Sequence, residues 1–187
     1  MRNNRCSAAA LKNVRVLTLA AMLVALSIVL GKLLSVTAGP FRISFENLPV
    51  LMAGIFLGPA AGCLTGIVAD LVGCLIVGYA INPIITVGAG CIGLLAGLLF
   101  RTLPDQPIRH LPEHTFRVFA SVMAAHIVGS MLIKSAGLML YYHYTLFQVA
   151  LRVPLYLVIG TAESLIIIGL LSNSAFASQI GRFRKDE

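Results

Sequence analysis

The sequence predicts an all-α integral membrane protein of six transmembrane helices with both termini in the cytoplasm. Three observations carry this prediction: the composition, the spacing of the apolar runs, and the distribution of basic residues. Of the 187 residues, 58% are hydrophobic and only 11% are charged, which lies outside the range of soluble globular domains. Because a spanning helix takes about 20 apolar residues, the chain has room for about six spans and no separate soluble catalytic domain.

The six expected helices form one membrane domain over residues 1–187, with a bundle over 14–171 between cytoplasmic tails over 1–13 and 172–187. The expected spans are 14–34, 43–57, 60–78, 83–100, 115–137 and 150–171. The second is short enough to be a half-span, since it ends at Gly58-Pro59, where the proline ring cannot continue a helix. Before the fourth, Asn82 suits a helix cap and Pro83 suits the first helical position.

Basic residues concentrate on one side of this predicted bundle. The side with both termini receives Arg2, Arg5, Lys12, Arg15, Arg101, Arg109, Arg117, Arg182, Arg184 and Lys185, and the other side receives Lys32, Arg42, Lys134 and Arg152. Cytoplasmic loops of membrane proteins carry the excess of Lys and Arg, which places both termini in the cytoplasm. The net charge of +7 therefore encodes topology, and we predict no nucleic-acid partner.

Four ionisable residues fall inside or at the rim of the apolar segments: Asp70, Glu163, Lys134 and Arg152. A charge at membrane depth costs a few kcal/mol even on the lenient insertion scale, so such residues usually mark a substrate or ion path. Asp70 contacts a ligand or ion, or else forms a structural bond between helices. Glu163 is its expected counterpart, and a lysine or arginine partner is the alternative.

The loop before the second span carries polar residues at every other position. Arg42, Ser44 and Glu46 alternate with Ile43 and Phe45, which gives a short extended or helical stretch one polar and one apolar face. Such a loop could close over a ligand. The alternative is that the arginine and the glutamate anchor a helix end at the lipid headgroups.

Aromatic and basic residues gather at the remaining outer turns. Tyr79 and Asn82 lie between the third and fourth spans, where we expect them to face the same vestibule as Arg42, although capping alone would explain the asparagine. Lys134, the run Tyr141-Tyr142-His143-Tyr144 and Arg152 follow the fifth span. Tyrosines in such a run either anchor helices at the headgroup layer or form a stacking surface for a flat ring.

No catalytic or metal site is predicted. His110-Leu111-Pro112-Glu113-His114 matches an inverted zinc-protease signature, but that chemistry needs both imidazoles on one continuous helix, which Pro112 breaks. His126 stands alone on an apolar face and is expected to be a hydrogen-bonded core residue. The sequence contains no Walker-type loop either, so uphill transport would draw its energy from another chain.

Several motifs together resemble a known family. In the first helix, Ala21 and Ala25 form a small-x-x-x-small pattern, which lets another helix dock closely. This helix after a basic tail, the loop Arg42–Pro49, the Gly58-Pro59 break, Ala69-Asp70-Leu71 and Tyr79–Pro83 resemble the substrate-binding S components of energy-coupling-factor vitamin transporters. The resemblance covers 14–171 and is strongest to the folate members.

The resemblance implies a six-helix protein of the bacterial plasma membrane that binds a vitamin from outside, without a cofactor of its own. It would pass the vitamin to a transmembrane coupling protein and two ATPase subunits, which alone use ATP. Ala21 and Ala25 would meet the coupling protein. The substrate-binding residues would be Arg42, Ser44, Glu46, Asp70, Tyr79, Asn82, Lys134, Tyr141 and Arg152.

For folate, Asp70 or Glu46 would accept the paired N–H donors of the pterin, and Arg42, Lys134 and Arg152 would meet the carboxylates of the glutamate tail. Thiamine, pantothenate, riboflavin and a queuosine precursor are alternatives within the same class. A second class is a stand-alone secondary carrier that uses Asp70 or Glu163 as a proton-coupling site.

Overall fold

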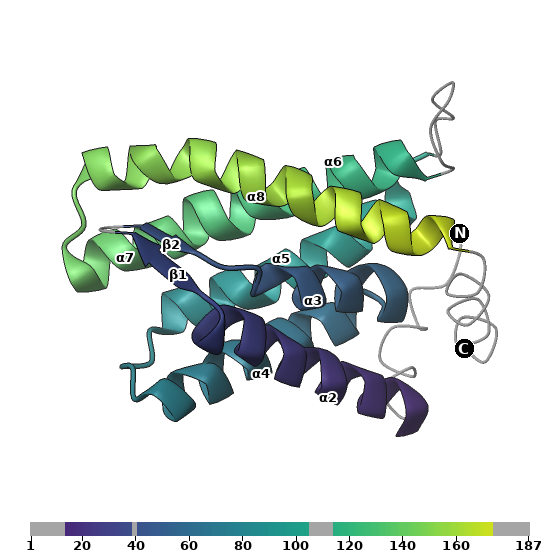
Figure 1. The fold of residues 1–187 in the computed structure, drawn as a ribbon, viewed down its shortest axis with the longest axis horizontal. Helices are drawn as coiled ribbons and strands as arrows, with labels where there is room; N and C mark the ends of the chain where they lie inside the picture. The colour runs from purple at the N-terminus through teal and green to yellow at the C-terminus, as the bar shows by residue number, and fades with distance from the viewer. Residues whose placement is uncertain (1–13, 39–40, 105–113, 174–187) are drawn as a thin grey trace.

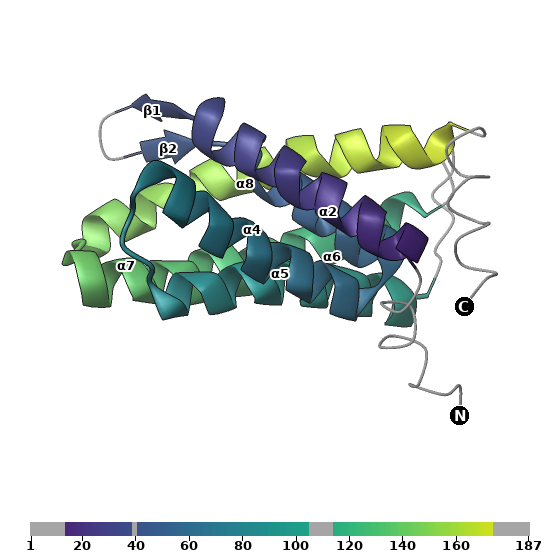
Figure 2. The same cartoon turned by 90° about the horizontal axis from the view of Figure 1, so that it is seen from below.

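The computed structural model describes residues 14–38, 41–104 and 114–173, which form a bundle of long helices lying side by side (Figures 1 and 2). In chain order the elements are α2 (Val14–Ile28) with π-helical η2 (Val29–Leu33), β1 (Val36–Ala38), β2 (Phe41–Ile43), α3 (Asn47–Met52) with η3 (Ala53–Leu57), α4 (Pro59–Val77), α5 (Pro83–Thr102), α6 (Thr115–Ala125) with η4 (His126–Lys134) and α7 (Ser135–Tyr142), and α8 (Leu146–Ser172). The predicted helical architecture is confirmed, and the two strands add only a small hairpin.

Within the described residues, five continuous helices are long and apolar enough to cross a membrane: Val14–Leu33, Pro59–Val77, Pro83–Thr102, Thr115–Tyr142 and Leu146–Ser172. The expected second span forms the shorter apolar helix Asn47–Leu57. At 1.5 Å per residue it extends roughly 16 Å, about half of the hydrocarbon thickness. The count of six spans and the orientation of the termini therefore stay predictions, and the tails 1–13 and 174–187 lie outside the described residues.

The end of the fifth expected span and the start of the sixth differ from the prediction. The fifth helix continues to Tyr142, and α8 begins at Leu146, so the first two residues of the tyrosine run are helical and only a three-residue turn remains. His143 takes a left-handed conformation there (φ 52°), and Thr145 caps α8 through a capping box with Gln148. The sequence predicts a longer loop because polar residues lower the hydropathy between 138 and 149. A helix can nevertheless extend beyond the apolar part of a membrane.

Helices α4 and α5 pack closely through glycines. A Cβ on Gly66 would lie 2.2 Å from the carbonyl oxygen of Ala89, and one on Gly93 would lie 2.2 Å from the carbonyl oxygen of Gly62. A Cβ on Gly54 of η3 would likewise meet the oxygen of Gly93 at 2.3 Å. Small residues let backbones approach to this distance, so η3, α4 and α5 form one unit with little room to shift.

Both predicted helix boundaries around α4 and α5 are confirmed. Gly58 adopts φ 108° directly before Pro59, the first residue of α4, a conformation that an L side chain rarely adopts. Asn82 caps α5 by accepting hydrogen bonds from the amides of Ile84 and Ile85, at 3.0 and 3.4 Å.

The hairpin and the hydrophobic core lie at different levels of the bundle. Strands β1 and β2 pair antiparallel, with Thr37 opposite Arg42, at the end of the bundle where α7 lies (Figures 1 and 2). The largest cluster of buried apolar side chains joins α3, η3, α5, α6 and the second half of α8, around Leu51, Ile92 and Ile167. The end near the hairpin is therefore free of this core and can hold a cavity.

Candidate functional site

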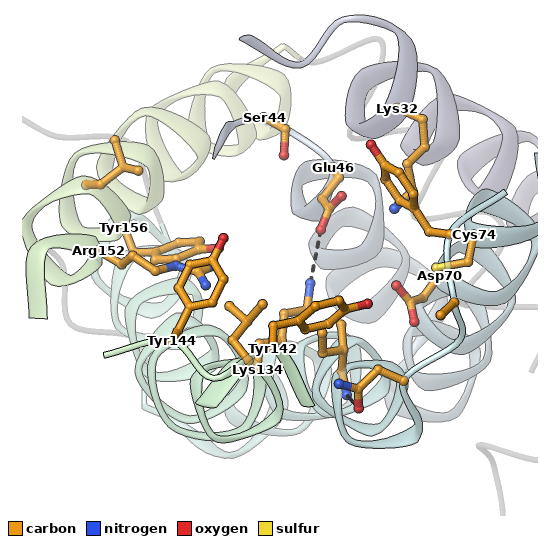
Figure 3. A pocket seen from close by; sticks show the side chains of 16 residues that line it. Lys32, Ser44, Glu46, Asp70, Cys74, Lys134, Tyr142, Tyr144, Arg152 and Tyr156 are labelled. Atoms are coloured by element: carbon orange, nitrogen blue, oxygen red, sulfur yellow. Dashed lines mark hydrogen bonds and ion pairs between the residues drawn. The ribbon is translucent and has the colours of Figure 1, made fainter. Parts of the chain in front are cut away.

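A cavity of about 330 Å³ opens at the hairpin end of the bundle (Figure 3). Its volume lies within the range of pockets that bury small-molecule ligands. The side chains that line it are Lys32, Ser44, Glu46, Asp70, Cys74, Tyr79, Ala80, Asn82, Ile85, Lys134, Leu138, Tyr142, Tyr144, Arg152, Leu155 and Tyr156. They come from η2, the segment after β2, α4, the α4–α5 turn, α5, η4, α7, the α7–α8 turn and α8, so segments far apart in the sequence meet at one site.

An ion pair stands in the middle of the cavity. The ammonium of Lys134 donates to Oε1 of Glu46 at 3.1 Å and to the side-chain oxygen of Asn47 at 3.2 Å. Lys134 itself is 5% exposed, and its Cγ lies 2.8 Å from where Gly88 would carry a Cβ, so the glycine makes space for the lysine stem. Lys134 is thereby engaged with the protein and ties η4 to the start of α3.

One side of the cavity is built from α4 and α5. Asp70 is half-buried and accepts a hydrogen bond on Oδ2 from the hydroxyl of Thr86 at 2.7 Å. The amide nitrogen of Asn82 donates to the carbonyl of Gly137 at 3.1 Å, while its oxygen caps α5. The side chain of Asn82 is therefore occupied structurally, and Asp70 supplies the negative charge of this side.

Lys32 also lies on this side of the cavity. The sequence predicts only that this lysine belongs to the outer side of the bundle, and gives it no role in binding. Its ammonium stands 5.9 Å from the ring centroid of Tyr79, and its Cε lies 2.8 Å from where Gly73 would carry a Cβ. A single lysine within an apolar run was the available signal, but it fits a residue that snorkels to the headgroups equally well.

The opposite side is built from α8 and the α7–α8 turn. The guanidinium of Arg152 donates to the hydroxyl of Tyr156 at 2.8 Å and lies 5.3 Å from the centroid of the same ring. Tyr144 lies beside this pair, and Tyr142 of α7 lies between it and the Asp70 side (Figure 3). Within the described part of the chain, neither Arg152 nor Lys32 forms an ion pair with a carboxylate.

Most of the predicted binding residues meet in this cavity: Ser44, Glu46, Asp70, Tyr79, Asn82, Lys134 and Arg152 line it. Tyr141 does not line it and is 54% exposed, because successive helical residues point about 100° apart and Tyr142 takes the inward direction. The side chain of Arg42 lies outside the described residues. Ala21 and Ala25 are exposed on α2 and do not line the cavity.

The charges divide the cavity into two unlike parts. Figure 3 shows Asp70 and Lys32 on one side, Arg152 with Tyr144 and Tyr156 on the other, and the bonded Glu46 between them. The central ion pair neutralises itself, so a bound molecule meets a carboxylate on one side and a guanidinium among aromatic rings on the other. This arrangement suits a flat molecule with N–H donors at one end and an anionic group at the other.

The comparison with known families identifies the chain. The sequence profile described as "ECF transporter, substrate-specific component" matches residues 15–180. The protein belongs to the ECF transporter substrate-specific components. Among curated proteins, none matches the chain at a significant level.

Two of the solved structures that share the fold of this S component match most of the chain. One is described as the crystal structure of FolT bound with folic acid; it matches with a TM-score of 0.64 and 23% identity, over 84% of this chain and 92% of that chain. The other is described as the S component of a bacterial ECF transporter; it matches with a TM-score of 0.64 and 21% identity, over 86% and 95% of the two chains. The family is one of transporter components, and the S component is an integral membrane protein.

The structure corrects the expected partnership of Asp70 with Glu163. Asp70 bonds to Thr86, whereas Oε2 of Glu163 lies 2.6 Å from Nε2 of His126. The partner of Glu163 is thus neither an aspartate nor a lysine or arginine. The expectation that His126 is a hydrogen-bonded core residue is confirmed, since both side chains of this pair are fully buried.

The rejected zinc motif lies mostly beyond the described chain. His110, Pro112 and Glu113 lie outside the described residues, while His114 takes a left-handed conformation (φ 71°) before α6. Among the residues described, no group of three His, Cys, Asp or Glu side chains is placed to hold a metal ion. That the S component carries no metal or cofactor stays a prediction.

Proposed function

We propose that this S component binds folate in the cavity at the hairpin end and passes it to a coupling protein and two ATPase subunits. The observation that carries the proposal is the division of the cavity into a carboxylate side and a guanidinium-and-tyrosine side, separated by the Glu46–Lys134 ion pair. The structural neighbour bound with folic acid has the same fold and supports the choice of vitamin.

The pterin ring would occupy the side formed by α4 and α5. A pterin carries an exocyclic amine next to a ring N–H, and a carboxylate accepts such a pair of donors through both oxygens. The Thr86 hydroxyl holds one oxygen of Asp70 at 2.7 Å, which orients the carboxylate before the ligand arrives. Tyr79 offers an aromatic edge at the mouth of the same side.

The glutamate tail of folate would extend toward α8. Arg152 is the cation available there, because among the described residues its guanidinium donates to the Tyr156 hydroxyl but forms no ion pair, which leaves further N–H donors for a carboxylate. Lys32 lies on the side of Asp70 and Tyr79 (Figure 3), so Arg152 is the cation that we assign to the tail. Lys134 instead balances Glu46, so its expected role shifts from contacting the vitamin to holding the cavity together.

The orientation and the partners follow from the charge distribution and from α2. With the termini in the cytoplasm of a bacterial cell, the hairpin end opens to the outside, where the vitamin is captured. Ala21 and Ala25 are exposed on α2, and small residues four apart let a helix of the coupling protein pack closely. Ala21→Trp should leave vitamin binding intact and block ATP-driven uptake, whereas Val158→Trp, at a 69% exposed position of α8, should affect neither.

The deciding experiment identifies the ligand directly. We would purify the protein in detergent, determine by mass spectrometry which small molecule it retains, and measure the affinities for folic acid, thiamine, pantothenate and riboflavin by calorimetry. Folic acid should bind more tightly than the other three by at least two orders of magnitude. Tight binding of thiamine, pantothenate or riboflavin, or retention of a queuosine precursor, would reassign the vitamin.

Reconstitution separates this function from that of a stand-alone carrier. In proteoliposomes that contain this chain alone, we expect folate binding without accumulation, and accumulation only after the coupling protein, the ATPases and ATP are added. Accumulation driven by a proton gradient in the chain alone would establish the secondary carrier instead.

A further inference from the structure

A second buried polar cluster lies next to the cavity but outside its lining. Nε2 of His126 lies 2.6 Å from Oε2 of Glu163, and Nδ1 of the same ring lies 3.2 Å from the hydroxyl of Ser130. Both members of the pair are 0% exposed, and they join η4 to α8. Oε1 of Glu163 is buried with no hydrogen-bond partner among the described residues.

Stability alone is a weak reason for such a pair. Replacing a buried ionic pair with apolar side chains of similar volume is often neutral or stabilising, while ionisable residues at membrane depth usually serve function. The local backbone also accommodates the pair. A Cβ on Gly160, three residues before Glu163, would lie 3.1 Å from Cδ2 of His126 and from Sδ of Met123, so the imidazole packs closely against α8 there.

The pair contacts the aromatic wall of the cavity. The ring centroids of His126 and Tyr156 lie 5.9 Å apart at an interplanar angle of 33°. Tyr156 lines the cavity and accepts the hydrogen bond from Arg152. Because Arg152 and Tyr156 are four residues apart, and Glu163 follows seven residues later, all three lie on nearly the same face of α8. A contact at Glu163 therefore sets the rotation of the face that carries Arg152.

The π-helical segment η4 links this pair to the ion pair of the cavity. It begins at His126, which bonds to Glu163, and ends at Lys134, which bonds to Glu46. Segments of π-helix occur frequently at functional sites, and here one such segment holds a buried polar contact at each end. The first contact faces α8 and the second faces the start of α3.

We propose that His126 and Glu163 are positioning residues of the vitamin site, which hold α8 against η4 so that Arg152 and Tyr156 face Lys134 and Glu46 across the cavity. The inference rests on the proposed function for the identity of the ligand, but the placement of Tyr156 can be measured without one. Neither residue of the pair contacts the vitamin.

The first test reads ligand affinity in a double-mutant cycle. Folic acid binding is measured by calorimetry for the wild type, Glu163→Gln, Arg152→Gln and the double variant. Glu163→Gln should weaken binding about tenfold in the wild-type background but less than threefold when Arg152 is already replaced, since its effect passes through that residue. Equal effects in both backgrounds, or an unchanged affinity of Glu163→Gln, would overturn the proposal.

The second test needs no vitamin. A 3-fluorotyrosine placed at position 156 of the ligand-free protein reports its surroundings by fluorine NMR. Glu163→Gln should shift and broaden this resonance. The control Ser121→Ala removes a buried hydroxyl of α6 that has no hydrogen-bond partner among the described residues, and it should leave the resonance unchanged. An unmoved resonance in Glu163→Gln refutes the positioning role, whichever vitamin the protein binds.

Two further arrangements keep the outcomes distinct. If Glu163→Gln does not yield folded protein, Gly160→Ala takes its place in both tests, because its added Cβ displaces the imidazole of His126 relative to Glu163 without removing either side chain. If the wild type does not bind folic acid, the proposed vitamin is wrong, and the fluorine resonance alone decides the positioning role.

Discussion

The two walls of the cavity are held in place by different kinds of contact. The wall of α4 and α5 is joined to η3 by backbone-to-backbone packing at glycines, such as Gly66 against Ala89. The wall of α8 contains Pro154 inside the helix. Only 28% of the residues in its most apolar stretch are buried, against 44% for α5. The first wall cannot move without breaking close backbone contacts, whereas α8 packs its second half into the hydrophobic core and joins η4 through the His126–Glu163 pair. We therefore expect Asp70 to provide the part of recognition that needs fixed geometry, and Arg152 and Tyr156 to adjust to the size of the ligand.

The largest expected effect comes from the glycine contacts of the first wall. In Gly93→Ala the new Cβ would lie 2.2 Å from the carbonyl oxygen of Gly62, and such overpacking should lower the free energy of unfolding by about 3 kcal/mol, the upper end of the usual range. Thermal unfolding in detergent measures it. Gly169→Ala on α8 is the matched control, because nothing lies within 4 Å of its added Cβ, and it should be neutral or stabilising by roughly 0.5–1 kcal/mol. Equal destabilisation by both variants would remove the distinction between the walls.

The next effect concerns the ion pair between the walls. Lys134→Met removes the donor that Glu46 and Asn47 share and should destabilise the ligand-free protein by about 1–3 kcal/mol, since polar groups lose their partner. The melting temperature without vitamin measures it. The double variant Lys134→Met/Glu46→Gln should recover part of the loss, because the uncompensated charge is gone. A Lys134→Met protein of normal stability that fails only in folic acid binding would return Lys134 to the ligand.

Asp70 tests the first wall as a recognition surface. Asp70→Asn keeps the size of the side chain but loses its charge, and should weaken folic acid binding roughly 10- to 100-fold, the value of about 1.5–3 kcal/mol for a hydrogen bond to a charged group. Calorimetry at constant ionic strength measures the affinity. Thr86→Ser retains the hydroxyl that orients Asp70 and should bind normally. A normal affinity of Asp70→Asn would make this carboxylate purely structural.

Arg152 tests the second wall, where the expected loss is smallest. Arg152→Gln should reduce the affinity for folic acid about tenfold, because a carboxylate loses its charged partner. The affinity of Arg152→Gln for pteroic acid, which lacks the glutamate tail, should fall by less than threefold. If both ligands lose the same factor, Arg152 acts on the ring or on the fold of α8 and not on the tail.

Much of the fold was predictable because each decisive signal is local. The apolar runs, the Gly58-Pro59 break and the cap at Asn82 act within a few residues of themselves, and the structure contains all three. Charged residues at membrane depth, such as Asp70 and Arg152, could also be recognised from the sequence, since charges are rare within hydrocarbon. Which tyrosine of the run lines the cavity was harder to predict, because a shift of one residue along the helix decides whether Tyr141 or Tyr142 points inward.

Partnerships between distant helices were not predictable in this way. Glu163 could have met Asp70, Lys134 or Arg152 by sequence, and it meets His126, because α6, η4 and α8 pack together. No feature of the sequence around Lys32 distinguishes it from a lysine that reaches the lipid headgroups. In the structure it lines the cavity beside Tyr79.

The amino-acid sequence on its own decided that the chain is a helical membrane protein with ionisable groups at depth, because hydropathy and helix-breaking residues act over short stretches of chain. Tertiary structure alone decided which of those groups pair with one another and which face the cavity. The reason is physical: a buried charge is satisfied by whichever polar group the helix packing brings within hydrogen-bond distance. Here that packing joins Lys134 to Glu46 and His126 to Glu163, and directs Asp70 and Arg152 toward the cavity.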